Sequence, residues 1–185
     1  KLTPEQIEMY LTVAREVGVD AVITISNDFT SSPEQHPVEI NRRLLGKTEL
    51  YHFSWFSFLT ALNVLSEGDE VGDRDHQFLL DELERFLIHP SARLQRFTQM
   101  TTSWTSLLDR IRSGLTTSKT SDEVISVVES WHSELRDLCL LTTRKTGAYV
   151  DLKLPTKLKN NPSERLKADA KSVAENCLLC AALIV

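Results

Sequence analysis

Positive charge is concentrated in one part of an otherwise acidic sequence, where side chains could bind phosphate groups. Residues 144–171, the basic segment, contain eight Lys or Arg and three Asp or Glu, whereas the whole chain has a net charge of -5. Such a surface attracts a nucleic-acid backbone or an acidic partner without reading bases. The residues expected to contact phosphates are Lys153, Lys157, Lys159, Arg165 and Lys167. The alternative is a solvated surface that binds nothing.

Most other chemistry-bearing residues form no recognisable motif. The five histidines lack metal-ligand spacing, and the six glycines do not cluster into a phosphate-binding loop. Cys177 and Cys180 open an expected strand, where residues three apart face opposite sides, so we interpret them as buried, small apolar residues. One acidic group could bind a divalent cation, although a favourable helix entrance explains it more simply. Its members are Asp69, Glu70, Asp73 and Asp75.

The composition indicates an ordinary globular protein. The chain has 185 residues, of which 41% are hydrophobic and 25% are charged. No apolar run approaches the roughly 20 residues needed to cross a bilayer, and no signal segment opens the sequence. The chain has three cysteines, and such a small, odd number does not suit a disulfide framework. We therefore expect a soluble, cytoplasmic protein.

The first half of the chain predicts the order helix–strand–strand–helix–helix. A capped helix begins at Thr3 and ends at Gly18. The β-branched run 20–28 predicts a strand buried on both faces, and residues 49–53 predict a second strand. Helices are expected over residues 55–65 and 75–88. The inner face of the latter should contain Phe78, Leu79, Leu83, Phe86 and Leu87.

The second half predicts a helical module that also contains a β-α-β arrangement. A helix is expected around residues 104–111, followed by a long helix that Thr120 and Glu123 cap. Strands are expected over residues 148–154 and 178–185, with a helix from Asn161 to about Asn176 between them. The fold class is thus mixed α/β (α+β). We divide it into modules at residues 1–95 and 96–185.

Gln6 and Tyr10 lie four residues apart on one side of the first helix, which a buried strand follows at once. This arrangement resembles the Q-x-x-x-Y helix of the PD-(D/E)XK nuclease superfamily, especially its RecB-type branch. Residues 22–29 and 49–65 resemble the later part of such a core, as in a group of uncharacterised bacterial proteins. The resemblance covers residues 1 to about 66. It predicts a partial nuclease-like α/β core.

The resemblance implies magnesium-dependent hydrolysis of nucleic-acid phosphodiesters. In that superfamily a hairpin bearing an Asp and a Glu-x-Lys precedes the helix, and its carboxylates hold Mg²⁺. Gln6 and Tyr10 would support the site and the substrate. The metal ligands would lie upstream of residue 1, where we expect further chain, so these residues alone should be inactive. The structural alternatives are a capping role for Gln6 and a core position for Tyr10.

The competing function is that of a non-catalytic module, which binds nucleic acid or a protein partner. A run of aromatic residues could form its contact surface or could belong to the core. Its members are Tyr51, Phe53, Trp55, Phe56 and Phe58. The oligomeric state stays open at this point.

Overall fold

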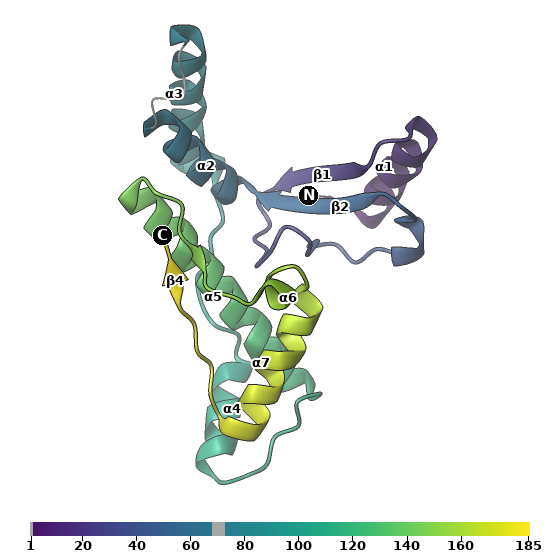
Figure 1. Ribbon diagram of the computed structural model, residues 1–185, viewed down its shortest axis with the longest axis vertical. Coiled ribbons are helices and arrows are strands. Elements are labelled where there is room, and N and C mark those ends of the chain that lie inside the picture. Colours follow the sequence, from purple (N-terminus) through teal and green to yellow (C-terminus); the bar gives the residue numbers. More distant parts are fainter. Residues whose placement is uncertain (1, 68–72) are drawn as a thin grey trace. The chain divides into compact units, whose positions relative to one another are not determined.

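The computed structural model describes residues 2–67 and 73–185, which form a mixed α+β structure. Its backbone divides into two compact units, residues 1–96 and residues 97–185, called the first and the second unit below (Figure 1). Asp69 and Glu70 of the acidic group lie outside the described residues. Among the described helices, none combines the length and apolar character needed to cross a membrane.

Helix α1, Pro4–Val17, begins and ends where the sequence predicts. The Thr3 hydroxyl accepts a hydrogen bond from the Gln6 backbone, and the Gln6 side chain accepts one from the Thr3 backbone, which completes a capping box. Gly18 closes the helix with a left-handed backbone (φ 78°) that glycine adopts without a Cβ clash. The helix buries Ile7, Leu11 and Ala14.

Two parallel strands form the sheet of the first unit (Figure 1). Strand β1, Ala21–Ser26, pairs with β2, Glu49–Ser54, in a register that places Thr24 opposite His52. The prediction that β1 is buried on both faces is wrong, because Ile23 is 61% exposed and Ile25 is 37% exposed. Both faces of a strand are buried only where a layer packs on each, and the described part of this unit covers one face.

Helices α2, Trp55–Glu67, and α3, Arg74–Ile88, follow the sheet and pack against each other. The predicted inner face of α3 is wrong, because Phe78, Leu79 and Phe86 are exposed and only Leu87 is buried. One neighbouring helix cannot cover a wide apolar stripe.

The aromatic run around the start of α2 is largely covered. Phe56 is buried, whereas Tyr51, Phe53, Trp55 and Phe58 are half-buried. The rings of Trp55 and Phe58 meet edge to face with their centroids 5.8 Å apart. The run is therefore partly covered, with only Phe56 fully buried among its five members.

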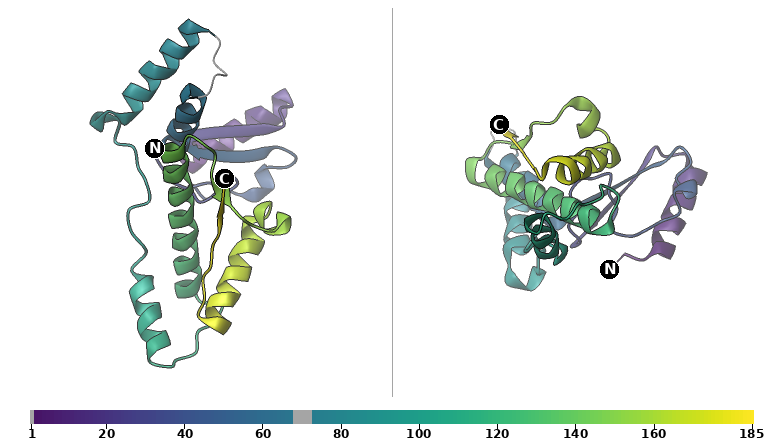
Figure 2. Two further views of the ribbon diagram at one scale, coloured as in Figure 1. Left: turned by 60° about the vertical axis from the view of Figure 1, so that its left-hand side comes forward. Right: turned by 90° about the horizontal axis from the view of Figure 1, so that it is seen from below.

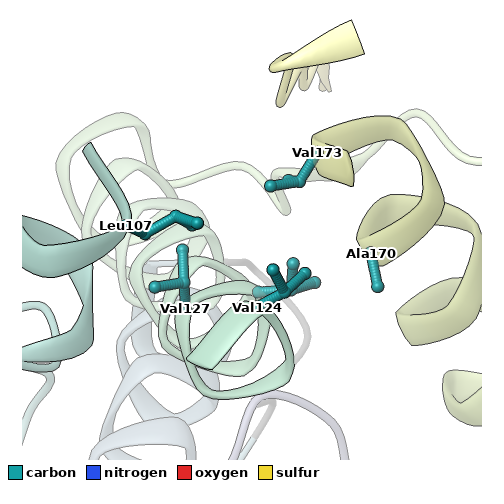
Figure 3. Close-up of a cluster of buried hydrophobic side chains, with 6 residues drawn as sticks. Leu107, Val124, Val127, Ala170 and Val173 are labelled. Carbon is teal, nitrogen blue, oxygen red and sulfur yellow. The ribbon is translucent and has the colours of Figure 1, made fainter. Parts of the chain in front are cut away.

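The second unit is built on helix α5, Asp122–Thr146, against which α4, Ser103–Arg112, and α7, Pro162–Asn176, both pack (Figure 2). Their shared core contains small and branched side chains that point toward one another (Figure 3). It consists of Leu107, Val124, Val127, Val128, Ala170 and Val173. The cap of α5 differs from the prediction, since Ser121 rather than Thr120 accepts the hydrogen bond from the helix.

The strands of the second unit are shorter than predicted. Only β3, Asp151–Leu152, and β4, Leu183–Ile184, pair, and they do so antiparallel, with the short helix α6, Thr156–Lys159, after β3. The burial expected for the C-x-x-C pair is also wrong. Cys177 ends α7 as its C-cap and Cys180 lies in the following extended segment, and both are exposed. Helix α7 ends at Asn176 as predicted, but strand β4 begins only at Leu183.

The left-handed backbone of Cys177 (φ 52°, ψ 38°) gives a stability prediction. A Cβ in this conformation costs about 1 kcal/mol, whereas glycine adopts it freely. We expect Cys177→Gly to be more stable than Cys177→Ala by about 1 kcal/mol in urea unfolding under reducing conditions, because only Gly relieves the strain. Equal stability of the two variants would contradict this account of the helix end.

Candidate functional site

A pocket of about 590 Å³ lies at the carboxyl end of β1. Helix α1 contributes Gln6 and Tyr10 to its wall, the chain after β1 contributes residues 26–28, and Trp55 comes from the start of α2. Side chains from α1, from the end of β1 and from the start of α2 thus meet at one cavity. The carboxyl ends of parallel strands are the usual place for ligands in open α/β sheets, so this pocket is the candidate functional site.

The structure brings Gln6 and Tyr10 to this pocket in different situations. Gln6 is exposed, and its Oε1 accepts the backbone N–H of Thr3 at 3.1 Å, so the capping role is realised. The NH₂ group of the same amide is still a hydrogen-bond donor. Tyr10 is 41% exposed and is not a core residue. The two side chains therefore offer donors along one wall of the pocket.

Asn27 and Asp28 are pocket residues that the sequence reasoning missed. The Nδ2 atom of Asn27 donates to the carbonyl oxygen of Ala92 at 3.4 Å, while its buried Oδ1 atom has no hydrogen-bond partner. Asp28 Oδ2 accepts a hydrogen bond from the Ser26 hydroxyl at 3.1 Å. A polar pair directly after a β-branched strand was the available signal, because such residues emerge at the sheet edge where ligands bind.

A buried histidine, His52, and a half-buried one, His36, hold this end of the sheet together. His52 is 1% exposed, and its Nδ1 lies 2.9 Å from the Thr24 hydroxyl, while its Nε2 lies 3.0 Å from the carbonyl oxygen of Asp28. The same hydroxyl lies 3.1 Å from Nε2 of His36, in the loop between the strands. Since buried polar groups need partners, this network fixes residue 28 relative to both strands.

The described wall of the pocket carries one carboxylate, that of Asp28. Mg²⁺ prefers six oxygen ligands, usually with one or two carboxylates. The wall offers the carboxylate of Asp28 and the unpaired Oδ1 of Asn27. In the described part of the chain, no group of three or more His, Cys, Asp or Glu could hold a metal ion. Of the acidic group, Asp73 instead caps α3 by accepting the Asp75 backbone N–H at 3.0 Å.

The five cations predicted to contact phosphates lie around β3, α6 and α7 in three different environments. Lys153 and Lys157 are exposed. Lys159 pairs with Asp151 at 2.7 Å and Lys167 pairs with Glu164 at 3.0 Å. Only 11% of the Arg165 side chain is exposed, and its Nε lies 3.7 Å from a carboxylate oxygen of Asp169.

Electrostatics show that some of these cations are neighbours. The hydrogen bond from Lys167, its charge and the charge of Lys157 hold the pKa of the Glu164 carboxyl below its ordinary value. Lys157 and Lys167 therefore lie on one stretch of surface, although α6 and α7 carry them. Arg165 belongs to a different environment, because burial lowers the pKa of its guanidinium.

Because His36 belongs to the network with Thr24 and His52, we expect the stability of the fold to depend on pH. Burial is the main cause that lowers the pKa of His36, the charge of His52 acts in the same direction, and the Val38 carbonyl and Asp28 oppose it. Near and below about pH 6.5 the unfolded chain binds a proton on this imidazole that the folded protein resists. The unfolded state then binds more protons, so stability should fall as the pH drops.

We expect His36→Asn to reduce the loss of urea midpoint between about pH 7.5 and about pH 5.5. The Asn side-chain oxygen can still accept the Val38 N–H, which donates to Nδ1 of His36 at 3.1 Å. His76→Asn is the matched control, since that side chain is 73% exposed. The same pH dependence in His36→Asn and in the unsubstituted chain would contradict the prediction.

Comparison with known proteins adds no family to this geometry. No protein-family model matches the chain, and neither a curated protein nor a solved structure does. The arrangement of side chains at the carboxyl end of β1 is therefore the main support for a function.

Proposed function

We propose that this chain is the later part of a PD-(D/E)XK-like nuclease core, with its metal ligands upstream of residue 1. The observation that carries the proposal is that Gln6 and Tyr10 line one pocket with the carboxyl end of β1. The reaction would be magnesium-dependent hydrolysis of nucleic-acid phosphodiesters. The cysteines at positions 139, 177 and 180 are free, which fits a reducing, cytoplasmic location.

The edge of the sheet supports this proposal. Among the described residues, β1 pairs only with β2, so its other edge offers unpaired backbone groups. Ile23 and Ile25 are exposed on that strand, and Met9, Val13 and Val17 are exposed on α1. Unpaired edges and contiguous apolar surfaces are sites where further structure packs. A strand hairpin added to β1 would cover them and would bring its carboxylates toward the pocket.

The residues of this chain would act on the substrate rather than on the metal. The NH₂ group of Gln6 and the hydroxyl of Tyr10 can donate hydrogen bonds to non-bridging phosphate oxygens. The carboxylate of Asp28 can accept from sugar hydroxyls or water. A magnesium ion, when bound, would stabilise negative charge on the phosphate and favour a hydroxide nucleophile.

Two conservative substitutions separate substrate contact from folding. Gln6→Glu keeps a capping box, since Glu serves at this position as well as Gln, but it removes the NH₂ donor and adds a negative charge. Tyr10→Phe removes only the hydroxyl. In a protein that includes the upstream ligands, we expect each variant to lower kcat/KM for DNA or RNA cleavage about tenfold or more, with an unchanged urea midpoint.

Glu16→Gln is the matched control, because Glu16 is exposed on the same helix and does not line the pocket. It should leave cleavage unchanged. The chain of residues 1–185 alone should not cleave nucleic acid. Chelator-sensitive cleavage by residues 1–185, or full activity in both site variants, would disprove the proposal.

The second candidate is a non-catalytic nucleic-acid-binding module. The observation that favours it is the exposure of Lys153 and Lys157, with Lys167 on the same surface as Lys157. Exposed cations of this kind contact phosphates and contribute affinity that depends on salt. This candidate requires no metal ligands from upstream of residue 1. It predicts that the chain binds nucleic acid without cleaving it.

Charge reversal tests the binding surface. We expect Lys153→Glu combined with Lys157→Glu to weaken binding of a DNA or RNA duplex and to flatten its dependence on salt, because about two phosphate contacts are lost. Arg112→Glu combined with Lys119→Glu is the matched control, with the same charge change at two exposed cations of the same unit. An equal loss in both double variants would indicate that net charge alone governs binding.

A further inference from the structure

A second pocket, of about 260 Å³, lies within the second unit. Its apolar wall includes Leu152 of β3 and Leu154 just after it. Helix α7 contributes Arg165 and Asp169 to the wall. Lys153 and Cys180 also line the pocket. The cavity therefore combines apolar side chains with a few charged groups, which is the usual composition of a small-molecule site.

Arg165 is the unusual member of this wall. Its side chain is 11% exposed, and its buried Nε atom has no hydrogen-bond partner. Asp169 lies 3.7 Å from that nitrogen, which makes an ion pair but is too long for a hydrogen bond. A buried donor without an acceptor destabilises the folded protein by about 1–3 kcal/mol, and by more when it is charged. The Nε atom of this guanidinium thus lacks the close acceptor that its burial requires.

Asp169 is already engaged by another residue. Its Oδ2 atom lies 2.6 Å from Nε2 of His132, a buried side chain of α5. This hydrogen bond is much shorter than the contact with Arg165, so the carboxylate oxygen interacts more strongly with His132 than with Arg165. With Lys153 and Arg165 set against Asp169 alone, the wall carries one more cation than anion. The pocket is therefore electrostatically suited to a negatively charged group.

We propose that this pocket binds a small organic carboxylate with a compact apolar body. The carboxylate accepts hydrogen bonds from the guanidinium of Arg165, and Lys153 adds a second positive charge. The apolar body packs against Leu152 and Leu154. The apolar wall favours this class over inorganic phosphate, because burial of a strongly hydrated ion beside leucines is costly. A planar guanidinium also matches the two oxygens of a carboxylate.

This inference is independent of the proposed nuclease function. Every residue that carries it belongs to the second unit, whereas Gln6 and Tyr10 belong to the first. Its readout is ligand binding, and no nucleic acid takes part. Its failure would therefore leave the nuclease proposal unaffected.

The two exposed cysteines provide the test. Cys180 lines this pocket, whereas Cys177 lines a different one, so Cys177 serves as an internal control. The full chain is alkylated with iodoacetamide, and the rate at each cysteine is read by peptide mass spectrometry. The probe is hexanoate, and hexanamide is its neutral isostere. At about three times the Kd, hexanoate should slow Cys180 alkylation about fourfold and leave Cys177 unchanged.

Variants extend the test. Arg165→Gln should abolish the protection of Cys180 by hexanoate, whereas Lys171→Gln, at an exposed cation on the same helix, should preserve it. If Arg165→Gln fails to fold by circular dichroism, the comparison of hexanoate with hexanamide on the unsubstituted chain decides the question. Equal protection by hexanamide, protection by inorganic phosphate in place of hexanoate, equal slowing of both cysteines, or no protection would overturn the proposal.

Discussion

The parallel pairing of β1 with β2 is the constraint on which the candidate pocket depends. Because Ser26 and Ser54 are partners at the ends of the two strands, residues 27–28 and the start of α2 emerge at the same sheet edge. The Thr24 hydroxyl lies within hydrogen-bond distance of His36 and His52, which ties the connecting loop to both strands. Without this register, the walls that come from α1, β1 and α2 would not meet.

Local signals predicted the boundaries of the helices, but tertiary packing decided their buried faces. Thr3 and Gly18 mark the ends of α1 through interactions within a few residues, and such interactions can be read directly from sequence. Phe78 and Phe86 belong to an apolar stripe whose burial depends on a partner layer. The same holds for Ile23 on β1. A periodic pattern indicates which face is apolar, but it does not show what covers that face.

The candidate site was predictable to a similar extent. Helical spacing alone places Gln6 and Tyr10 on one face, whereas the contribution of Asp28 depends on its contacts with His52, which lies 24 residues further along the chain. Charge counting identified residues 144–171 as rich in Lys and Arg. It could not show that Arg165 is buried beside Asp169 while Lys153 stays exposed. Net charge is a property of composition, but the availability of each charge is a property of packing.

The open edge of β1 limits what the first unit can do without further structure packed against it. An exposed strand edge with apolar flanks favours pairing with another strand, because its backbone groups gain hydrogen bonds and its side chains leave water. A hairpin from the same chain that carries carboxylates would add metal ligands beside Gln6 and Tyr10. A strand from a protein partner would satisfy the same edge without adding chemistry. What pairs with β1 therefore decides whether the pocket beside Gln6 and Tyr10 gains metal ligands.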